Sequence, residues 1–268
     1  MQLTEENYTS ALPQEASLKD LCLFLSDYAA WLLGCGATCI RIEKNVHRMC
    51  APLGVRAEIN IMPTHIHLSV WNNDLTDSYS NIRKIRKTGI SFNINTQLSK
   101  LSWEIADGKI KYAEAVKKFI EITKTRPANK WWVLIMASFA NASFCRLFGG
   151  DLISMLIVFM ATICGYRLKQ IMLEEKADVR LVFFCCGFIS SIIGSAGHLF
   201  GWGATPEIAL GTSVLYLIPG IPYINSVSDM LDGHYLCAIN RFIDAAVLTT
   251  CLSAGLCGGL LMMDLNWF

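Results

Sequence analysis

Charged side chains are scarce in the second half of this 268-residue sequence. Residues 131–268 hold only 6 Lys and Arg and 9 Asp and Glu, whereas residues 1–130 hold 17 and 13. Soluble domains are roughly one-quarter charged, against 17% for this whole chain. The chain is therefore poorer in charge than a typical soluble domain, although short globular core helices in the second half remain an alternative to membrane spans. We expect two domains in two environments, with a charged module over 1–130 and a hydrophobic module over 131–268.

Catalytic and phosphate-binding patterns are also lacking. GCGAT (34–38) has neither the GxGxxG nor the GxxxxGK[ST] spacing, so we interpret it as a helix-to-helix turn. His65 and His67 share one face of a predicted strand, but a metal needs more ligands, and His47 is the only other histidine of this half. We predict no enzyme, metal, cofactor or nucleic-acid partner. A membrane-bound hydrolase using one of these histidines remains an alternative.

The 11 cysteines are odd in number and contain no CxxC pair. None falls in a predicted outer loop, so we expect free thiols that pack as small apolar groups. The sequence also begins with an acidic, polar segment rather than a basic and then apolar one, so we expect no signal peptide.

Long uncharged runs fill the second half, the longest being 181–206 and 208–228. A membrane-spanning helix needs about 17 to 25 mostly apolar residues. The fold class we predict is therefore an integral membrane α-helical protein with five spans. These are 131–148, 151–168, 180–200, 205–229 and 240–263.

Basic residues fall on one side of the predicted spans, which sets the orientation. The turn at 149–150, the loop around 201–206 and the tail at 264–268 contain no Lys or Arg, and Arg146 is the one misfit. The first 130 residues are predicted to be cytoplasmic and the C-terminus to lie outside. The residues on the cytoplasmic side are Lys124, Arg126, Lys130, Arg167, Lys169, Lys176, Arg180 and Arg241.

The first half is predicted to be a small α+β domain that ends in a linker at Thr125–Asn129. Helical periodicity and alternation predict two helices, two neighbouring strands and two further helices. We interpret residues 72–81 as a polar connection, and the basic RKIRK (83–87) as a solvated loop or a site for anionic lipid headgroups. The elements are 17–36, 38–52, 55–62, 64–71, 93–106 and 111–124.

The fourth span is predicted to break at LIPGIP (217–222). Pro219 and Pro222 each remove a backbone donor, and Gly220 weakens the helix further. The break falls about 20 Å into the span at 1.5 Å per residue, and broken helices within membranes surround substrate sites in transporters. A helix that restarts at Pro222 would offer its N-terminus to a carboxylate or a phosphate.

Polar residues follow the break at helical spacing. Asn225, Asp229 and Asp232 are at i, i+4 and i+7, which predicts one face of the second half-helix. Ionisable residues in spans often carry protons. We assign substrate contact to Asn225 and proton coupling to Asp229, Asp232 and Asp244, although Asp229 could simply reach the cytoplasmic interface and Asp244 could pair with Arg241.

On the outer side, RLFGGDL (146–152) joins the first two spans. Arg146 is placed favourably against the dipole of the first span, and Asp151 can cap the next helix. We interpret this polar pair as structural first.

Taken together in this order, four segments resemble the threonine/serine exporter (ThrE) family, and most of all its YjjP-type half-size members. The resemblance covers about 17–260. It is carried by GCGATCIRIE (34–43), VRAEINIMPTHIHLSV (55–70), FGGD (148–151) and LIPGIPYINSVSDMLDGHY (217–235).

This resemblance implies a bacterial inner-membrane subunit that exports threonine, serine or succinate together with a separate small YjjB-type membrane protein, as an oligomer in the lipid bilayer. Since no nucleotide motif exists, proton-driven secondary transport is the expected mode. The alternative in another class is a membrane-anchored sensor or scaffold.

Overall fold

The computed structural model describes residues 16–85, 88–125 and 128–263. Several predictions fall on residues outside these ranges. They are the acidic beginning of the chain, the end of the basic cluster at 83–87, the middle of the linker at 125–129 and the tail at 264–268.

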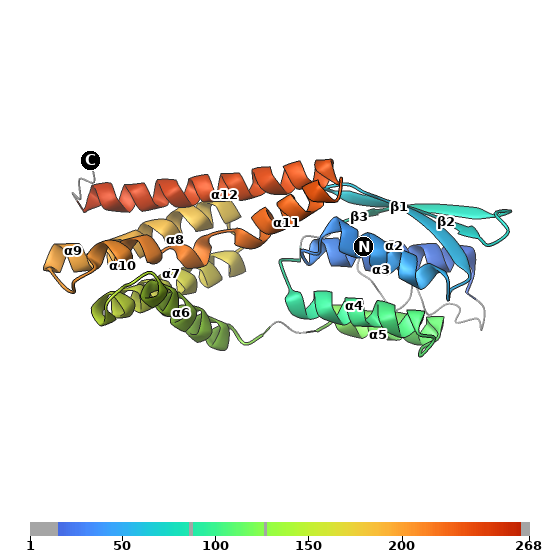
Figure 1. The fold of residues 1–268 in the computed structure, drawn as a ribbon, viewed down its shortest axis with the longest axis horizontal. Coiled ribbons are helices and arrows are strands. Elements are labelled where there is room, and N and C mark those ends of the chain that lie inside the picture. Colours follow the sequence, from blue (N-terminus) through green and yellow to red (C-terminus); the bar gives the residue numbers. More distant parts are fainter. Residues whose placement is uncertain (1–15, 86–87, 126–127, 264–268) are drawn as a thin grey trace. The chain divides into compact units, whose positions relative to one another are not determined.

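The chain forms two compact units, and the boundary between them is crossed three times (Figure 1). The first unit consists of Met1–Arg126 and Ile224–Arg241, and the second of Pro127–Tyr223 and Phe242–Phe268. The predicted division of the chain into two continuous domains, 1–130 and 131–268, remains a prediction. In terms of packing, the segment 224–241, here called the helical tip, belongs with the N-terminal residues.

The first unit begins with two helices, α2 (Leu18–Gly34) and α3 (Cys39–Cys50). Ser17 and Asp20 form the predicted capping box, since the amide of Asp20 donates to Ser17 Oγ (3.2 Å) and the amide of Ser17 to Asp20 Oδ2 (3.3 Å). Both predicted helices are confirmed, and so is the helix-to-helix turn between them.

A three-stranded antiparallel sheet follows, in the order β1 (Val55–Ile61), β2 (His65–Asn72) and β3 (Ser78–Lys84). The hairpin of the first two strands was predicted correctly. Two predictions were wrong because β3 covers their residues. Residues 78–81 were predicted to be part of a polar connection, and residues 83–84 to be part of a loop. SYSNIRK carries only one aliphatic residue, so its strand depends on pairing with β2 rather than on its own pattern.

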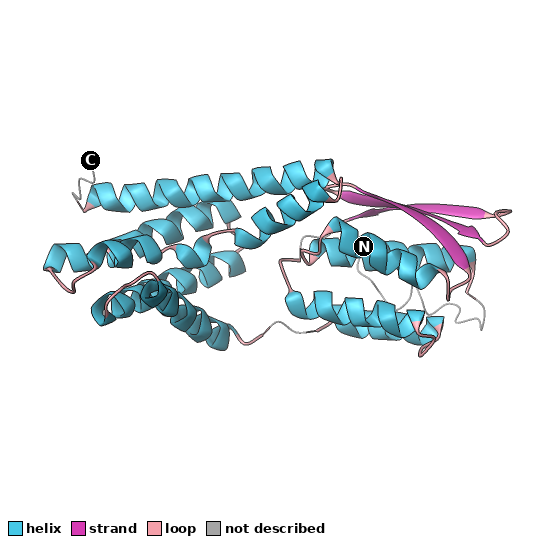
Figure 2. Cartoon of the chain, viewed as in Figure 1, coloured by secondary structure: helices cyan, strands magenta, loops and turns pink. Residues whose placement is uncertain are grey.

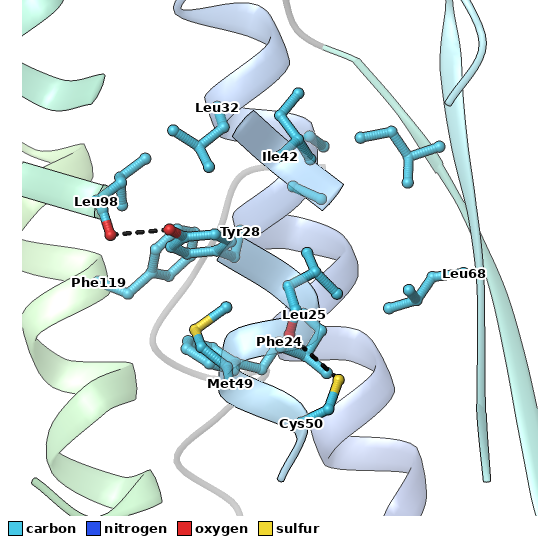
Figure 3. Packing of buried hydrophobic residues seen from close by; sticks show 14 of the residues in the cluster. Phe24, Leu25, Tyr28, Leu32, Ile42, Met49, Cys50, Leu68, Leu98 and Phe119 are labelled. Carbon is cyan, nitrogen blue, oxygen red and sulfur yellow. Dashed lines mark hydrogen bonds between the residues drawn. The ribbon is translucent and has the colours of Figure 1, made fainter. Parts of the chain in front are cut away.

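Three layers make up this unit (Figure 2). Helices α2 and α3 pack against the sheet, and α4 (Phe92–Ala106) and α5 (Tyr112–Thr123) cover their other side. The buried core joins all three layers, as Figure 3 shows for Tyr28, whose hydroxyl donates to the carbonyl of Leu98 (2.8 Å). Fully buried aromatic and aliphatic side chains make this unit a packed domain.

The described residues of the second unit form helices joined by short turns and loops, and include no strand. Helix α11 begins in the second unit and ends in the helical tip, and α12 begins in the helical tip and ends in the second unit. The elements are α6 (Lys130–Leu147), α7 (Leu152–Glu174), α8 (Val179–Gly194), α9 (Ala196–Phe200), α10 (Pro206–Thr212), the short 3-10 helix η1 (Leu215–Leu217), α11 (Gly220–Leu231) and α12 (Tyr235–Met262).

Among the described residues, three helical segments are long and apolar enough to cross a membrane: Leu152–Glu174, Val179–Phe200 and Tyr235–Met262. A fourth is the bent pair formed by Pro206–Leu217 and Gly220–Leu231, whose halves meet at 62°. The fold is therefore that of a mostly helical membrane protein with three or four candidate spans and a small sheet. The first of the five predicted spans, 131–148, is not among these candidates and remains a prediction.

Close helix packing in the second unit depends on Gly165 of α7. A Cβ atom at this position would overlap the hydroxyl of Tyr216 and Oγ of Ser190, which lie 2.9 Å apart and bond to each other. Tyr216 belongs to η1, directly before the break in the fourth span, so this glycine helps to place the break.

Gly165→Ala is therefore expected to destabilise the protein by about 1–3 kcal/mol, the usual cost of overpacking. The measurement is the apparent melting temperature of the detergent-solubilised protein. Gly211→Ala is the matched control, because a Cβ at this helical glycine meets nothing within 4 Å. Equal melting temperatures for the two variants would contradict the close contact.

Candidate functional site

The break in the fourth span lies where the sequence predicts it. Helix α10 ends at Thr212, η1 ends at Leu217, and α11 begins at Gly220. Pro222 is the third residue of α11, so its missing amide falls in the first turn, where no intrahelical acceptor exists. Helix α11 begins at Gly220, two residues before the restart that was predicted at Pro222. The local sequence thus ends one helix and starts another between residues 218 and 222.

Asn225 lies in the second turn of α11, within the helical tip. Its side-chain amide donates to the carbonyl of Gly36 at 2.8 Å. Gly36 is in the turn between α2 and α3, with a φ of +85° that favours glycine. The motif GCGAT therefore contacts the polar segment that follows the break, although the two are far apart in the sequence.

Asp229, one turn further along α11, is fully buried. Its Oδ1 accepts a hydrogen bond of 2.8 Å from the amide of Cys39, the first residue of α3. Its Oδ2 lies 3.2 Å from Nε of Arg241 in α12. The carboxylate thus meets a helix N-terminus and a guanidinium, both of which stabilise its charged form.

The second carboxylate oxygen is only partly satisfied. Among the described residues, no donor reaches Oδ2 of Asp229 with hydrogen-bond geometry. Arg241 lies within ion-pair distance but directs its NH2 group to the carbonyl of Ala37 (2.7 Å). A buried carboxylate oxygen without a full set of hydrogen bonds is uncommon in folded proteins, and this one stands out among the described residues for that reason.

Two thiols border this carboxylate. Cys39 hydrogen-bonds with Cys237, and this bond, together with burial and the nearby carboxylate of Asp229, raises the pKa of the Cys39 thiol. Cys237 also donates to the carbonyl of Ile61 at 3.4 Å. Both cysteines are free, as predicted, and both are buried.

Asp232 and Asp244 are placed differently from Asp229. Asp232 follows the last residue of α11 and is exposed, with its carboxylate 3.5 Å from the hydroxyl of Ser228. The amide of Asp232 still donates to the carbonyl of Ser228 (3.0 Å), so Asp232 continues the helical spacing by one residue, but its side chain is exposed whereas that of Asp229 is buried. Asp244 is exposed on α12, in the second unit.

Arg146 and Asp151 both make hydrogen bonds at the turn between α6 and α7. Asp151 is the N-cap of α7 and accepts from the amide of Ser154 (3.0 Å), the amide of Ala204 (3.0 Å) and the hydroxyl of Thr205 (3.0 Å). These bonds, those with Ser154 first, lower the pKa of its carboxyl. Arg146 donates instead to the carbonyl of Gly150 at 3.1 Å.

Asp151→Ala is expected to destabilise the protein more than the loss of an ordinary N-cap, because it removes both a cap and a link to the loop at 204–205. Asp178 offers the control. It caps α8 through a single bond to the amide of Arg180 (2.8 Å). Asp178→Ala should therefore lower the melting temperature of the solubilised protein less than Asp151→Ala, and the reverse order would contradict this account.

A buried polar cluster in the second unit was not predicted. The side-chain amide of Asn141 in α6 donates to Oγ1 of Thr162 (2.7 Å) and to the carbonyl of Thr212 (3.1 Å), the last residue of α10. Asn141 thus satisfies a carbonyl that the end of α10 leaves without a helical partner. The signal available in the sequence was a lone amide inside an apolar run, which does not identify its partners.

The histidines considered for hydrolysis do not form a cluster. His65 hydrogen-bonds with the neighbouring Thr64 (2.8 Å), and His67 is exposed on the same strand. Within the described ranges, no group of three His, Cys, Asp or Glu could hold a metal ion. The most developed polar cluster of the first unit is the one around Asp229.

Comparisons with known proteins agree with the pattern of motifs. The profile of the family described as "Putative threonine/serine exporter" (ThrE) matches residues 24–263. A Klebsiella aerogenes protein described as "Probable succinate transporter subunit YjjP" is 26% identical over 255 residues, 94% of this chain and 96% of that protein. Its Escherichia coli K12 namesake is 26% identical over 244 residues, 90% and 93% of the two chains.

A longer relative is the Mycobacterium tuberculosis protein described as "Probable threonine/serine exporter". It is 23% identical over 202 residues, which make up 74% of this chain but only 37% of that protein. No solved structure gives a significant match to the chain.

Proposed function

The chain belongs to the threonine/serine exporter family, and we propose that it is one membrane subunit of a secondary exporter of small carboxylate-bearing metabolites. The names of its relatives and its apolar helices support a membrane transport protein. Succinate is the first substrate to test, because two relatives of nearly the same extent carry that substrate in their names. Threonine and serine are the others.

The observation that carries this proposal is the extent of the match. The chain spans 96% of a relative described as a subunit, but only 37% of a longer relative described as an exporter. We infer that a separate small membrane protein of the YjjB type supplies the remaining module, and that the two form an oligomer in the bacterial inner membrane. The N-terminus is proposed to be cytoplasmic and the C-terminus to lie outside.

The substrate carboxylate is proposed to bind at the break in the fourth span. Among the first residues of α11, the amide of Gly220 donates to the carbonyl of Ile218 (2.8 Å) and Pro222 has no amide hydrogen, so the amide of Ile221 and the helix dipole are what this N-terminus offers an anion. Pro219, Gly220 and Pro222 shape this end, since they fix where α11 begins. Asn225, one turn further, would link the occupied break to the turn at Gly36.

Proton coupling is proposed to act through Asp229. Protonation of its carboxylate would neutralise one half of the ion pair with Arg241 and weaken the bond from the Cys39 amide. The helical tip would then be held less firmly against the α2–α3 turn, so protonation and movement of α11 would be linked. Asp232 and Asp244, both exposed, would serve as secondary proton carriers.

Efflux from proteoliposomes tests the function. Liposomes with this chain, with and without a YjjB-type partner, are loaded with labelled succinate, threonine or serine, and efflux is followed with and without a pH gradient. Partner-dependent, gradient-driven efflux is the expected result. Equal efflux without the partner would overturn the two-subunit proposal. No efflux of any compound would overturn transport and favour a membrane-anchored sensor or scaffold.

A further inference from the structure

A cleft of about 480 Å³ lies between α3 and α4 in the first unit, and none of the residues assigned to transport lines it. Its size is within the range of small-molecule sites. Arg41, Lys44 and Arg48 face it from α3, at spacings of three and four that place them on one side of the helix. The remaining lining residues are Thr38, Ile40, Asn45, Thr96, Ser99 and Trp103.

The positive charge of this cleft is not neutralised by the protein. Across the residues that the structure describes, the ion pairs lie elsewhere and none includes Arg41, Lys44 or Arg48. No acidic side chain lines the cleft. Three like charges within two turns repel one another, so an anion that binds between them gains from all three.

Buried neutral groups hold one of these cations in place. NH1 of Arg48 donates to Oδ1 of Asn45 (2.8 Å) and to Oγ of Ser102 (2.8 Å), and its guanidinium lies 3.7 Å from the ring centre of Trp103. Asn45 is itself buried and anchored to the hydroxyl of Tyr28 (3.1 Å). These bonds fix the guanidinium without cancelling its charge, which lowers the ordering cost of binding a ligand.

Polar groups of both helices complete the lining. Thr38 and Ile40 border the cleft at the first turn of α3, whose N-terminal amide at Cys39 is already bonded to Asp229 (2.8 Å). Arg41 donates to Oδ1 of Asn95 at 3.0 Å, which directs its side chain across to α4. Hydroxyls of Thr96 and Ser99 face the cations at the spacing of one helix face, and can bond to the oxygens of an anion.

We propose that this cleft is a binding site for a soluble metabolite with two negative charges, such as a dicarboxylate or a phosphate. It is separate from the transport site and does not depend on the proposed export activity. A site of this kind would let the first unit respond to the concentration of an anionic metabolite.

The test is titration of the full chain, in nanodiscs of zwitterionic lipid, with inorganic phosphate and with succinate at constant ionic strength, and with chloride as the monovalent control. Binding is followed by tryptophan fluorescence. Trp103 lines the cleft, so the fluorescence change on binding should vanish in Trp103→Phe, even though six other tryptophans remain. Saturable binding of a dianion, and none of chloride, is expected. Arg41→Gln/Lys44→Gln should weaken it by about 100-fold, given roughly tenfold for each charge-assisted bond lost.

Lys100→Gln is the matched control, since this lysine is an exposed cation of α4 that does not line the cleft. Dianion affinity that is the same in the double variant and wild type would overturn the proposal, as would a fluorescence change that Trp103→Phe leaves unchanged. The Trp103 signal separates this site from the break in the fourth span, because Trp103 lines the cleft. If nanodiscs with anionic lipid block phosphate binding in wild type, the occupant is a lipid headgroup, and the soluble-ligand proposal is wrong.

Discussion

Asp229→Asn is expected to reduce pH-gradient-driven efflux to the level of liposomes without the chain, while exchange of substrate across the membrane persists. Asparagine has nearly the same size as aspartate, and its carbonyl oxygen can still accept from the amide of Cys39. It cannot take up and release a proton, so only the coupled step should be lost. The measurement is labelled succinate efflux with a gradient, beside exchange at equal concentrations without one.

Asp232→Asn is the matched comparison for this prediction, since Asp232 is proposed only as a secondary proton carrier. Asp232 lies three residues further along the chain, is exposed, and has only a 3.5 Å contact with Ser228. Its variant should retain most of the driven efflux. Driven efflux that survives in Asp229→Asn would assign the proton to another group. Loss of exchange as well as driven efflux would indicate that Asp229 holds the structure together rather than carries protons.

The fold could be predicted from the sequence wherever a local pattern determines the structure. The capping box at Ser17 and Asp20, the periodicity of α3 and the alternation in β1 and β2 each arise from neighbouring residues. The third strand could not be predicted in this way. Its residues are mostly polar, and what makes them a strand is the row of free hydrogen-bonding groups that β2 presents along its edge.

The candidate site was predicted only in part, for the same reason. The break at Pro219 and Pro222 and the spacing of Asn225 and Asp229 are local features, and they identified this segment. Their partners, the turn around Gly36 and the amide of Cys39, lie about 190 residues away in the sequence. No spacing rule connects such distant segments. Arg241 was considered only as a partner of Asp244, because these two lie three residues apart on one helix. Its contact with Asp229 joins two different helices, α12 and α11.

The ion pair of Asp229 and Arg241 should also dominate the stability of the helical tip. Asp229→Leu or Arg241→Met alone is expected to cost about 3–5 kcal/mol, because each leaves one charge buried without its partner. Asp229 is fully buried and the Arg241 side chain is only 16% exposed, so water cannot take over the lost interaction. The apparent melting temperature of the solubilised protein should fall for both variants.

The double variant, Asp229→Leu/Arg241→Met, separates the pair from its surroundings. Replacing a buried ion pair by apolar side chains is often close to neutral, so the double variant should be more stable than either single one. The half-exposed pair of Lys118 and Glu104 (2.9 Å) is the control, since single changes there should cost at most about 1 kcal/mol. Additive losses at Asp229 and Arg241 would contradict a direct pair.

A double variant that folds well but no longer couples efflux to the gradient would show that the charges serve transport rather than stability. Buried charges are costly to keep, and an apolar pair would fill the same space at lower cost. The partly satisfied Oδ2 of Asp229 points the same way, because a purely structural carboxylate would be expected to have both oxygens fully hydrogen-bonded. Stability and coupling measured on the same three variants therefore decide what this ion pair is for.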